Sequence, residues 1–320
     1  STRQPKNRVP LPTRAVILAA GHGTRLDPLT RELPKALVPF RGEALLERAL
    51  RQVASWGVRD VLVNCHAHAG QVVRALTSRP GATPRIHISY EPEILGTGGA
   101  LSCASWFVGG DTRPFWMLNA DVVAELDPAN LARKGLRGRT IATLWMEPLR
   151  GPRTVEMRSG TISNFRSDHP GAGGTYTFCG LQLLSPKILS YIPNGFSTII
   201  EAYEAAMADG WRVAGHEIPG SYWADVGNAE QYLDANREVA ARQKGSRADG
   251  TQIDPGADVH GKAKLHNAVV LQNASVGARA RCCNVIVGPG TRVNTECSGL
   301  VTRAAATCTT AERKALERLG

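Results

Sequence analysis

The chain of 320 residues lacks any apolar run of about 18 residues, the length that a helix needs to cross a bilayer. We therefore expect no transmembrane helix. The first residues, STRQPKNRVPLPTR, are basic and contain no apolar core, so they do not fit a secretory signal. Residues 1–13 are expected to form a flexible N-terminal arm.

Metal-binding and disulfide patterns are also missing. The seven cysteines are scattered and no CxxC pair occurs, which argues against a zinc site and against a disulfide framework. A reducing, cytoplasmic setting is the simplest expectation. The net charge is +10, yet the basic residues are dispersed rather than clustered. We expect no nucleic acid and no membrane as partner, whereas a positive field suits a phosphorylated small substrate.

Strand and helix patterns alternate through the first part of the chain. Residues 14–20 (RAVILAA) form a continuous apolar run typical of a buried parallel strand. Further strand patterns lie at 60–64, 85–90 and 114–119, with helical patterns at 43–56, 69–78 and 98–106. Several β-like stretches follow within 140–184, and then helices at 197–209 and 228–243. This order predicts an α/β protein with a mostly parallel sheet.

The period changes after Thr251. Ile253, Val259, Leu265 and Leu271 are spaced by six, and the phase then slips by one residue to Val270 and Val276. Small residues and glycines surround these positions. The pattern predicts a short left-handed parallel β-helix over 251–302, and residues 303–320 are expected to form a charged helical tail.

The most informative segment is LAAGHGTRLDPLTRELPK, residues 18–35. A buried strand leads into Gly21 and Gly23, whose backbone N–H groups can approach a polyphosphate closely. Arg25 and Lys35 add two cations, a planar fork and a mobile point charge. The segment has no Walker A ending, and Leu26 stands where a dinucleotide fingerprint needs its third glycine.

With this GxGTRLxPLTxxxPK pattern, the chain resembles the nucleoside-diphosphate-sugar pyrophosphorylases, or sugar-1-phosphate nucleotidyltransferases. The resemblance covers about 14–243, and the later repeats resemble the β-helix tails of some members. It implies a Rossmann-like nucleotidyltransferase domain, taken here as 14–245. It also implies that Arg25 and Lys35 hold the phosphates. The nucleotide-binding residues expected are Leu18, Ala20, Gly21, Gly23, Thr24, Glu91, Gly96, Thr97 and Asn119.

Two aspartates are candidates for a metal site. Asp121 follows a buried strand, and Asp225 precedes a helix. Two carboxylates together with phosphate oxygens suit Mg²⁺, but their spacing alone cannot pair them. The family resemblance supplies the pairing, with Asp121 in a "GD"-type motif and Asp225 in a "DIG"-type motif. Ala120 replaces the glycine that is usual in the first motif.

The base and the sugar are less well determined. Glu91, before the glycine-rich turn that opens a helix, could accept hydrogen bonds from guanine; this favours GTP and leaves UTP open. On the sugar side the resemblance points to Gly180, and Glu201 is a candidate for the sugar hydroxyls. The family's Glu-Lys-Pro lysine is missing from 165–170 (FRSDHP). Arg153 or Arg166 is expected to supply its charge.

The resulting hypothesis is a Mg²⁺-dependent enzyme that makes a nucleotide sugar and pyrophosphate from a nucleoside triphosphate and a sugar 1-phosphate. A mannose- or heptose-type sugar with GTP is favoured. The alternatives are a UTP-dependent enzyme for N-acetylmuramate and a silent, nucleotide-sugar-binding regulatory subunit. The repeat region is short for an acyltransferase, so we expect it to serve packing or self-association. His22, His66 and His68 are expected to be structural or incidental.

Overall fold

The computed structural model describes residues 11–301 except 80–83, 111, 126–127, 219, 244–245 and 248. The predicted helical tail at 303–320 and most of the predicted N-terminal arm lie outside the described residues. The chain divides into two compact units. The first holds the residues up to Gly21 and Leu46–Trp223, and the second holds His22–Leu45 and the residues from Ala224 onward.

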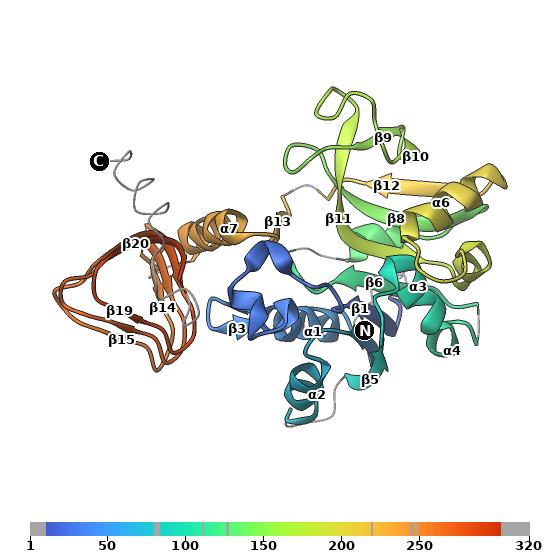
Figure 1. The fold of residues 1–320 in the computed structure, drawn as a ribbon. Helices are drawn as coiled ribbons and strands as arrows, with labels where there is room; N and C mark the ends of the chain where they lie inside the picture. The colour runs from blue at the N-terminus through green and yellow to red at the C-terminus, as the bar shows by residue number, and fades with distance from the viewer. Residues whose placement is uncertain are drawn as a thin grey trace, which may run out of the picture. The chain divides into compact units, whose positions relative to one another are not determined.

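The first unit is built on a nine-stranded sheet with the order β5-β4-β1-β6-β11-β8-β12-β10-β9. Its first four strands are parallel (Figure 1). They are β1 (Arg14–Leu18), β4 (Asp60–Cys65), β5 (Arg85–Tyr90) and β6 (Phe115–Asn119). The middle residues of β1 are fully buried, which explains why its sequence is continuously apolar rather than alternating.

Four helices connect these strands. They are α1 (Leu45–Ser55), α2 (Ala69–Thr77), α3 (Gly96–Cys103) and α4 (Ser105–Val108). This alternation confirms the predicted α/β class and the parallel core of the sheet.

The other half of the sheet is mixed. β11 (Thr175–Leu184) runs antiparallel to both β6 and β8 (Thr140–Glu147), and β12 (Arg212–His216) runs parallel to β8. The sheet ends with β10 (Thr161–Asn164) and β9 (Val155–Arg158). The remaining elements are β7 (Val122–Glu125), α5 (Ala129–Lys134) and α6 (Ile199–Ala208). β13 (Tyr222–Asp225) carries the chain into the second unit.

The second unit contains the Gly23–Lys35 segment, a small hairpin, a long helix and the C-terminal repeats. The hairpin pairs β2 (Pro39–Phe40) with β3 (Glu43–Ala44). Helix α7 spans Ala229–Arg242, and the side chain of its N-cap Asn228 accepts the Gln231 N–H at 2.9 Å, as the sequence pairing predicts.

The repeats form two parallel sheets of a β-helix. One contains β14 (Gln252–Ile253), β16 (Lys264–Val270), β18 (Arg281–Val287) and β20 (Glu296–Val301). The other contains β15 (Asp258–Val259), β17 (Ser275–Val276) and β19 (Arg292–Val293). Ile253 pairs with Val270 and Val270 with Val287, so these coils are one residue shorter than three units of six. This accounts for the phase slip in the sequence.

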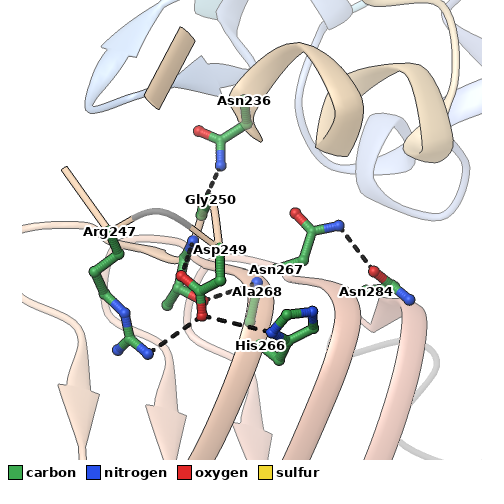
Figure 2. Close-up of polar contacts among 9 residues, drawn as sticks. Asn236, Arg247, Asp249, Gly250, His266, Asn267, Ala268 and Asn284 are labelled. Atoms are coloured by element: carbon green, nitrogen blue, oxygen red, sulfur yellow. Dashed lines mark hydrogen bonds and ion pairs between the residues drawn. The ribbon is translucent and has the colours of Figure 1, made fainter. Parts of the chain in front are cut away.

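Two corners of each coil need a left-handed backbone. Gly250, Asn267 and Asn284 stack at one corner with φ of 78°, 45° and 50°; Gly256, Asn273 and Gly290 stack at the other with φ of 81°, 61° and 62°. Glycine and asparagine adopt this conformation at the lowest cost. Asn267 Nδ2 also donates to Asn284 Oδ1 at 2.8 Å, so the corner side chains hydrogen-bond between coils (Figure 2).

None of the helices within the described ranges has the length and apolar character needed to span a membrane.

A buried carboxyl group in the first coil tests this packing. Asp254 is 5% exposed, and burial raises its pKa. The folded chain therefore holds the proton more tightly than the unfolded chain, so the contribution of this group to stability is lost as pH rises through the folded-state pKa. We expect Asp254→Asn to raise the unfolding midpoint by about 2 °C or more near pH 7.5, and by less near pH 4. Thermal unfolding at both pH values checks this, and an unchanged or lower midpoint near pH 7.5 would contradict it.

Candidate active site

The end of β1 is held by backbone and side-chain hydrogen bonds within the first unit. Ala19 N–H donates to Asn64 Oδ1 at 2.6 Å, and Leu18 O accepts the Ala120 N–H at 2.9 Å. These contacts place the chain that enters the glycine-rich loop beside the turn after β6, where Asp121 lies. Asn64 was not expected from the sequence to take part.

In the second unit the Gly23–Lys35 segment folds back on itself. Gly23 has φ 70°, and its carbonyl accepts the Leu26 N–H at 2.8 Å and the Thr30 hydroxyl at 2.9 Å. A Cβ at residue 23 would lie 2.8 Å from Lys35 Cβ. Gly23 is therefore required both for its backbone conformation and for the close packing of Lys35.

Arg25 and Asp225 meet beside Gly227. A Cβ at residue 227 would lie 3.2 Å from Arg25 Nη1 and 3.0 Å from Asp225 Oδ2. The Gly227 N–H donates to Gln231 Oε1 in the first turn of α7. The second unit thus brings together a predicted phosphate-binding cation and a predicted metal-binding carboxylate that are 200 positions apart in the chain.

On the first unit, Asn119 and Gly180 are packed together. Gly180 has φ 75°, and a Cβ there would lie 2.8 Å from Asn119 Nδ2. The glycine lies in β11 where the register against β8 shifts between Phe178 and Gln182. The bulge brings the backbone of β11 against the amide at the end of β6, two residues before Asp121.

The structure gives Glu91 protein partners that the sequence analysis did not name. Its carboxylate is 1% exposed, and both oxygens have protein donors: Asn64 Nδ2 at 2.8 Å and the Leu95 N–H at 3.2 Å. Glu91 therefore orients Asn64 and the turn before α3, and the contact with the base that the sequence predicts for it stays a prediction. His66 contacts the Glu91 carbonyl at 2.8 Å, which gives it a structural place.

The glycine-rich turn of α3 is packed against the segment before α6. Thr97 Oγ1 accepts the Ile199 N–H at 2.8 Å, and the Gly98 N–H donates to Ser197 O at 2.9 Å. A Cβ at Gly98 would lie 2.9 Å from the Thr198 carbonyl oxygen, and a Cβ at Gly96 would lie closer still to the Ser197 carbonyl oxygen. Gly96 and Thr97, predicted as nucleotide contacts, have structural partners here.

Glu201 also has a structural role that the sequence analysis missed. It forms a capping box with Thr198 at the start of α6, and the backbone N–H of Thr198 is the main cause that lowers the pKa of the carboxyl group. One oxygen of its carboxylate thus caps the helix, and the contact with sugar hydroxyls that was predicted for it stays a prediction. The signal was available, because Thr198-Ile-Ile-Glu201 has the spacing of a capping box.

The two arginines proposed to replace the missing lysine differ in their partners. Arg166 forms an exposed ion pair with Glu204. Arg153 donates from Nε to Thr175 O at 3.2 Å and from Nη2 to Ala172 O at 2.8 Å. A carboxylate offsets the charge of Arg166, whereas carbonyl oxygens leave most of the charge of Arg153 for an anion.

Within the part of the chain that the structure describes, no group of three or more His, Cys, Asp or Glu residues could hold a metal ion. Asp121 lies in the first unit and Asp225 in the second. Each carboxylate by itself offers the hard oxygen ligands that Mg²⁺ prefers. The donor chemistry of each residue therefore fits a metal that binds together with phosphate oxygens.

The fold and the loop define an α/β protein with a candidate phosphate-binding site. Residues 14–148 match the family model described as Nucleotidyl transferase. The resemblance seen in the sequence is thereby confirmed.

Curated relatives include mannose-1-phosphate guanylyltransferases. The catalytic subunit beta of Drosophila pseudoobscura pseudoobscura is 28% identical over 226 residues, covering 69% of this chain and 61% of the relative. The mannose-1-phosphate guanyltransferase of Candida albicans is 27% identical over 316 residues, covering 88% and 87%. The chain spans about 61% of the length of the first of these relatives.

A solved structure has a similar fold. The crystal structure of HddC from Yersinia pseudotuberculosis, complexed with GMP-PN, superimposes with a TM-score of 0.59 at 22% identity. The match covers 71% of this chain and 99% of that chain.

The close packing of α3 leads to a test. We expect Gly98→Ala to lower the free energy of unfolding by about 1–3 kcal/mol, because the new methyl group overlaps the Thr198 carbonyl. Gly110→Ala is the matched control, since no described atom lies within 4 Å of a Cβ at that position. Urea unfolding of the two variants measures the difference, and equal stabilities would show that the α3 turn tolerates a side chain.

Proposed function

We propose that this protein is a sugar-1-phosphate nucleotidyltransferase that joins a nucleoside triphosphate to a sugar 1-phosphate and releases pyrophosphate. The observation that carries the proposal is the arrangement of Arg25 and Asp225 around Gly227, next to a loop whose glycine packs on Lys35. Two cations and a carboxylate at one loop suit a bound, metal-assisted triphosphate. The names of the relatives support GTP and mannose 1-phosphate as substrates.

The reaction needs no protein nucleophile. A phosphate oxygen of the sugar 1-phosphate attacks the α-phosphorus in line, the bond from the α-phosphorus to the bridging oxygen breaks, and its electron pair leaves with pyrophosphate. Arg25 and Lys35 stabilise the charge that develops on pyrophosphate. Asp121 and Asp225 would hold Mg²⁺, which when bound supplies further charge neutralisation at the phosphates. Positioning and electrostatics together provide the catalysis.

Other residues bind or shape the nucleotide site in this proposal. Leu18, Ala20, Gly21, Gly23, Thr24 and Asn119 line the path of the nucleotide. Glu91, Gly96 and Thr97 act on the nucleotide site indirectly, by fixing the turn that opens α3. Gly180 and Arg153 lie on the sugar side, where Arg166 is the second candidate.

Two alternatives stay open under this proposal. A UTP-dependent enzyme for N-acetylmuramate uses the same phosphate chemistry. A silent regulatory subunit would be expected to lack a loop cation or a metal carboxylate, whereas Arg25, Lys35, Asp121 and Asp225 are all present. The cytoplasmic location and self-association through the β-helix stay predictions.

The deciding experiment measures pyrophosphate release with Mg²⁺, each nucleoside triphosphate and a panel of sugar 1-phosphates. The panel holds mannose, glucose, N-acetylglucosamine, N-acetylmuramate and heptose derivatives. We expect release with GTP and a mannose- or heptose-type sugar. Nucleotide binding without release from any pair would favour the regulatory alternative, and no nucleotide binding would refute the assignment of the loop.

The metal carboxylates are tested by Asp121→Asn. We expect turnover to fall by about 10²-fold or more, because the variant keeps the shape of the side chain and loses its charge toward Mg²⁺. Asp234→Asn is the control, since Asp234 is exposed on α7 and pairs with Arg237. Near-normal turnover of Asp121→Asn would refute the metal role.

The missing sugar-phosphate lysine is tested by comparing Arg153→Ala with Arg166→Ala. We expect Arg153→Ala to raise KM for the sugar 1-phosphate about tenfold, the effect of losing a charge-assisted hydrogen bond, and to leave KM for the nucleotide unchanged. Arg166→Ala is expected to have the smaller effect, because Glu204 already offsets its charge. If neither variant changes KM for the sugar 1-phosphate, another residue supplies this charge.

A further inference from the structure

Helix α7 contacts several parts of the second unit. Its N-terminal end follows Asp225 and Gly227, and the body of the helix packs on strands β16, β18 and β20 of the β-helix. The β2–β3 hairpin, which begins four residues after Lys35, also contacts this helix. The position of α7 therefore affects both Asp225, which precedes it, and the segment that follows Lys35.

Tyr232, the fourth residue of α7, joins the hairpin to the N-terminal part of this helix. Its hydroxyl donates to the Pro39 carbonyl at 2.5 Å, and its ring meets Phe40 edge to face with centroids 5.4 Å apart. The side chain is fully buried, and burial raises the pKa of its hydroxyl. The phenol thus stays protonated and keeps donating at all physiological pH values.

Arg41, at the tip of the hairpin, makes three hydrogen bonds to the far part of α7 and the residues beyond it. Nη1 donates to Asn236 Oδ1 at 3.2 Å, Nε to Gln243 Oε1 at 3.1 Å, and Nη2 to Ser246 Oγ at 2.8 Å. All three acceptors are neutral, and burial lowers the pKa of Arg41. Only the planar fork of a guanidinium can reach three separate acceptors in this way.

Arg41 also sits in a left-handed backbone conformation, with φ 53°. A non-glycine residue in this region costs free energy, and the hydrogen bonds of its side chain offset that cost. The tip of the hairpin is therefore defined by the contacts of Arg41 rather than by the intrinsic preference of its backbone.

Asn236 links Arg41 to the first coil of the β-helix by hydrogen bonds. It is fully buried, and while its Oδ1 accepts from Arg41 its Nδ2 donates to the Gly250 carbonyl (Figure 2). Gly250 is the first left-handed corner of the repeats. The preceding Asp249 accepts the Thr251 N–H at 3.0 Å and its hydroxyl at 2.9 Å, which fixes the entry into the first coil.

We propose that Arg41 is a positioning residue for the nucleotide site, acting with Asn236 to hold the hairpin after Lys35 against α7 and the β-helix. The β-helix then supports helix α7, which contacts the hairpin after Lys35 and directly follows Asp225. Through this helix the loop cations and Asp225 keep fixed positions relative to one another. This inference rests on the proposed function for its kinetic consequence. Its structural part, the order of the Gly23–Leu37 segment, is independent of activity.

The test is Arg41→Lys, which keeps the charge and loses the fork. We expect KM for the nucleoside triphosphate to rise about five- to tenfold, as for the loss of one or two such hydrogen bonds, while KM for the sugar 1-phosphate stays the same. Hydrogen–deuterium exchange should become faster in residues 23–37 without a matching change in β1 or β4. Arg237→Lys is the control, because Arg237 lies on α7 and pairs with exposed Asp234.

A second pair of variants, Gln243→Ala and Ser246→Ala, removes acceptors of Arg41 and leaves the arginine in place. They decide the question if Arg41→Lys fails to fold, and each should reproduce part of the effect. The proposal is overturned if these variants match the wild type in both the nucleotide KM and the exchange of residues 23–37. If the wild type proves inactive and exchange still accelerates in the variants, the proposed function fails and the positioning role stands.

Discussion

The charges of Arg25 and Asp225 come close together at Gly227, and much of the second unit is arranged to maintain this approach. A guanidinium and a carboxylate that both flank one backbone position leave no room there for a side chain. The Gly227 N–H is held by Gln231, so the start of α7 sets where the carboxylate lies. A phosphate-binding loop needs its charged groups at fixed positions, because catalysis by charge neutralisation depends on the distance between those groups and the reacting phosphates.

The first unit meets a comparable requirement with close backbone packing. Gly98 and Gly180 each occupy positions where a Cβ would contact another group within 2.9 Å. Asn64 and Glu91 add a buried polar network that joins the ends of β1, β4 and β5 to the turn of α3. Such networks specify one arrangement of loops, since any displacement leaves buried polar atoms without partners. The site is therefore supported by residues that need not touch a substrate.

Residues predicted from chemistry alone divide into two groups. The glycines and cations of the Gly21–Lys35 segment were recognised because their spacing is local and their chemistry is typical of phosphate binding. Glu91, Glu201 and Arg166 were recognised as charges, and the structure gives each a protein partner that the sequence analysis did not name. Glu91 bonds Asn64, 27 positions away, and Arg166 pairs with Glu204, 38 positions away. Glu201 differs, because its partner Thr198 is local and the capping box was readable.

The sequence by itself determined the α/β class, the strand that leads into the loop, and the repeats, because each depends on short-range periodicity of apolar residues and on local glycine and asparagine preferences. The apolar spacing of six also slips by one residue, from Leu271 to Val270. This slip matches coils that are one residue shorter than three units of six. Only the tertiary structure decided which polar groups form hydrogen bonds within the fold. Arg41 and Asn236 are 195 positions apart, and no local pattern marks either one. Their pairing follows from how the β2–β3 hairpin packs on α7, since a buried polar group must find its partner among the groups that the packing brings near.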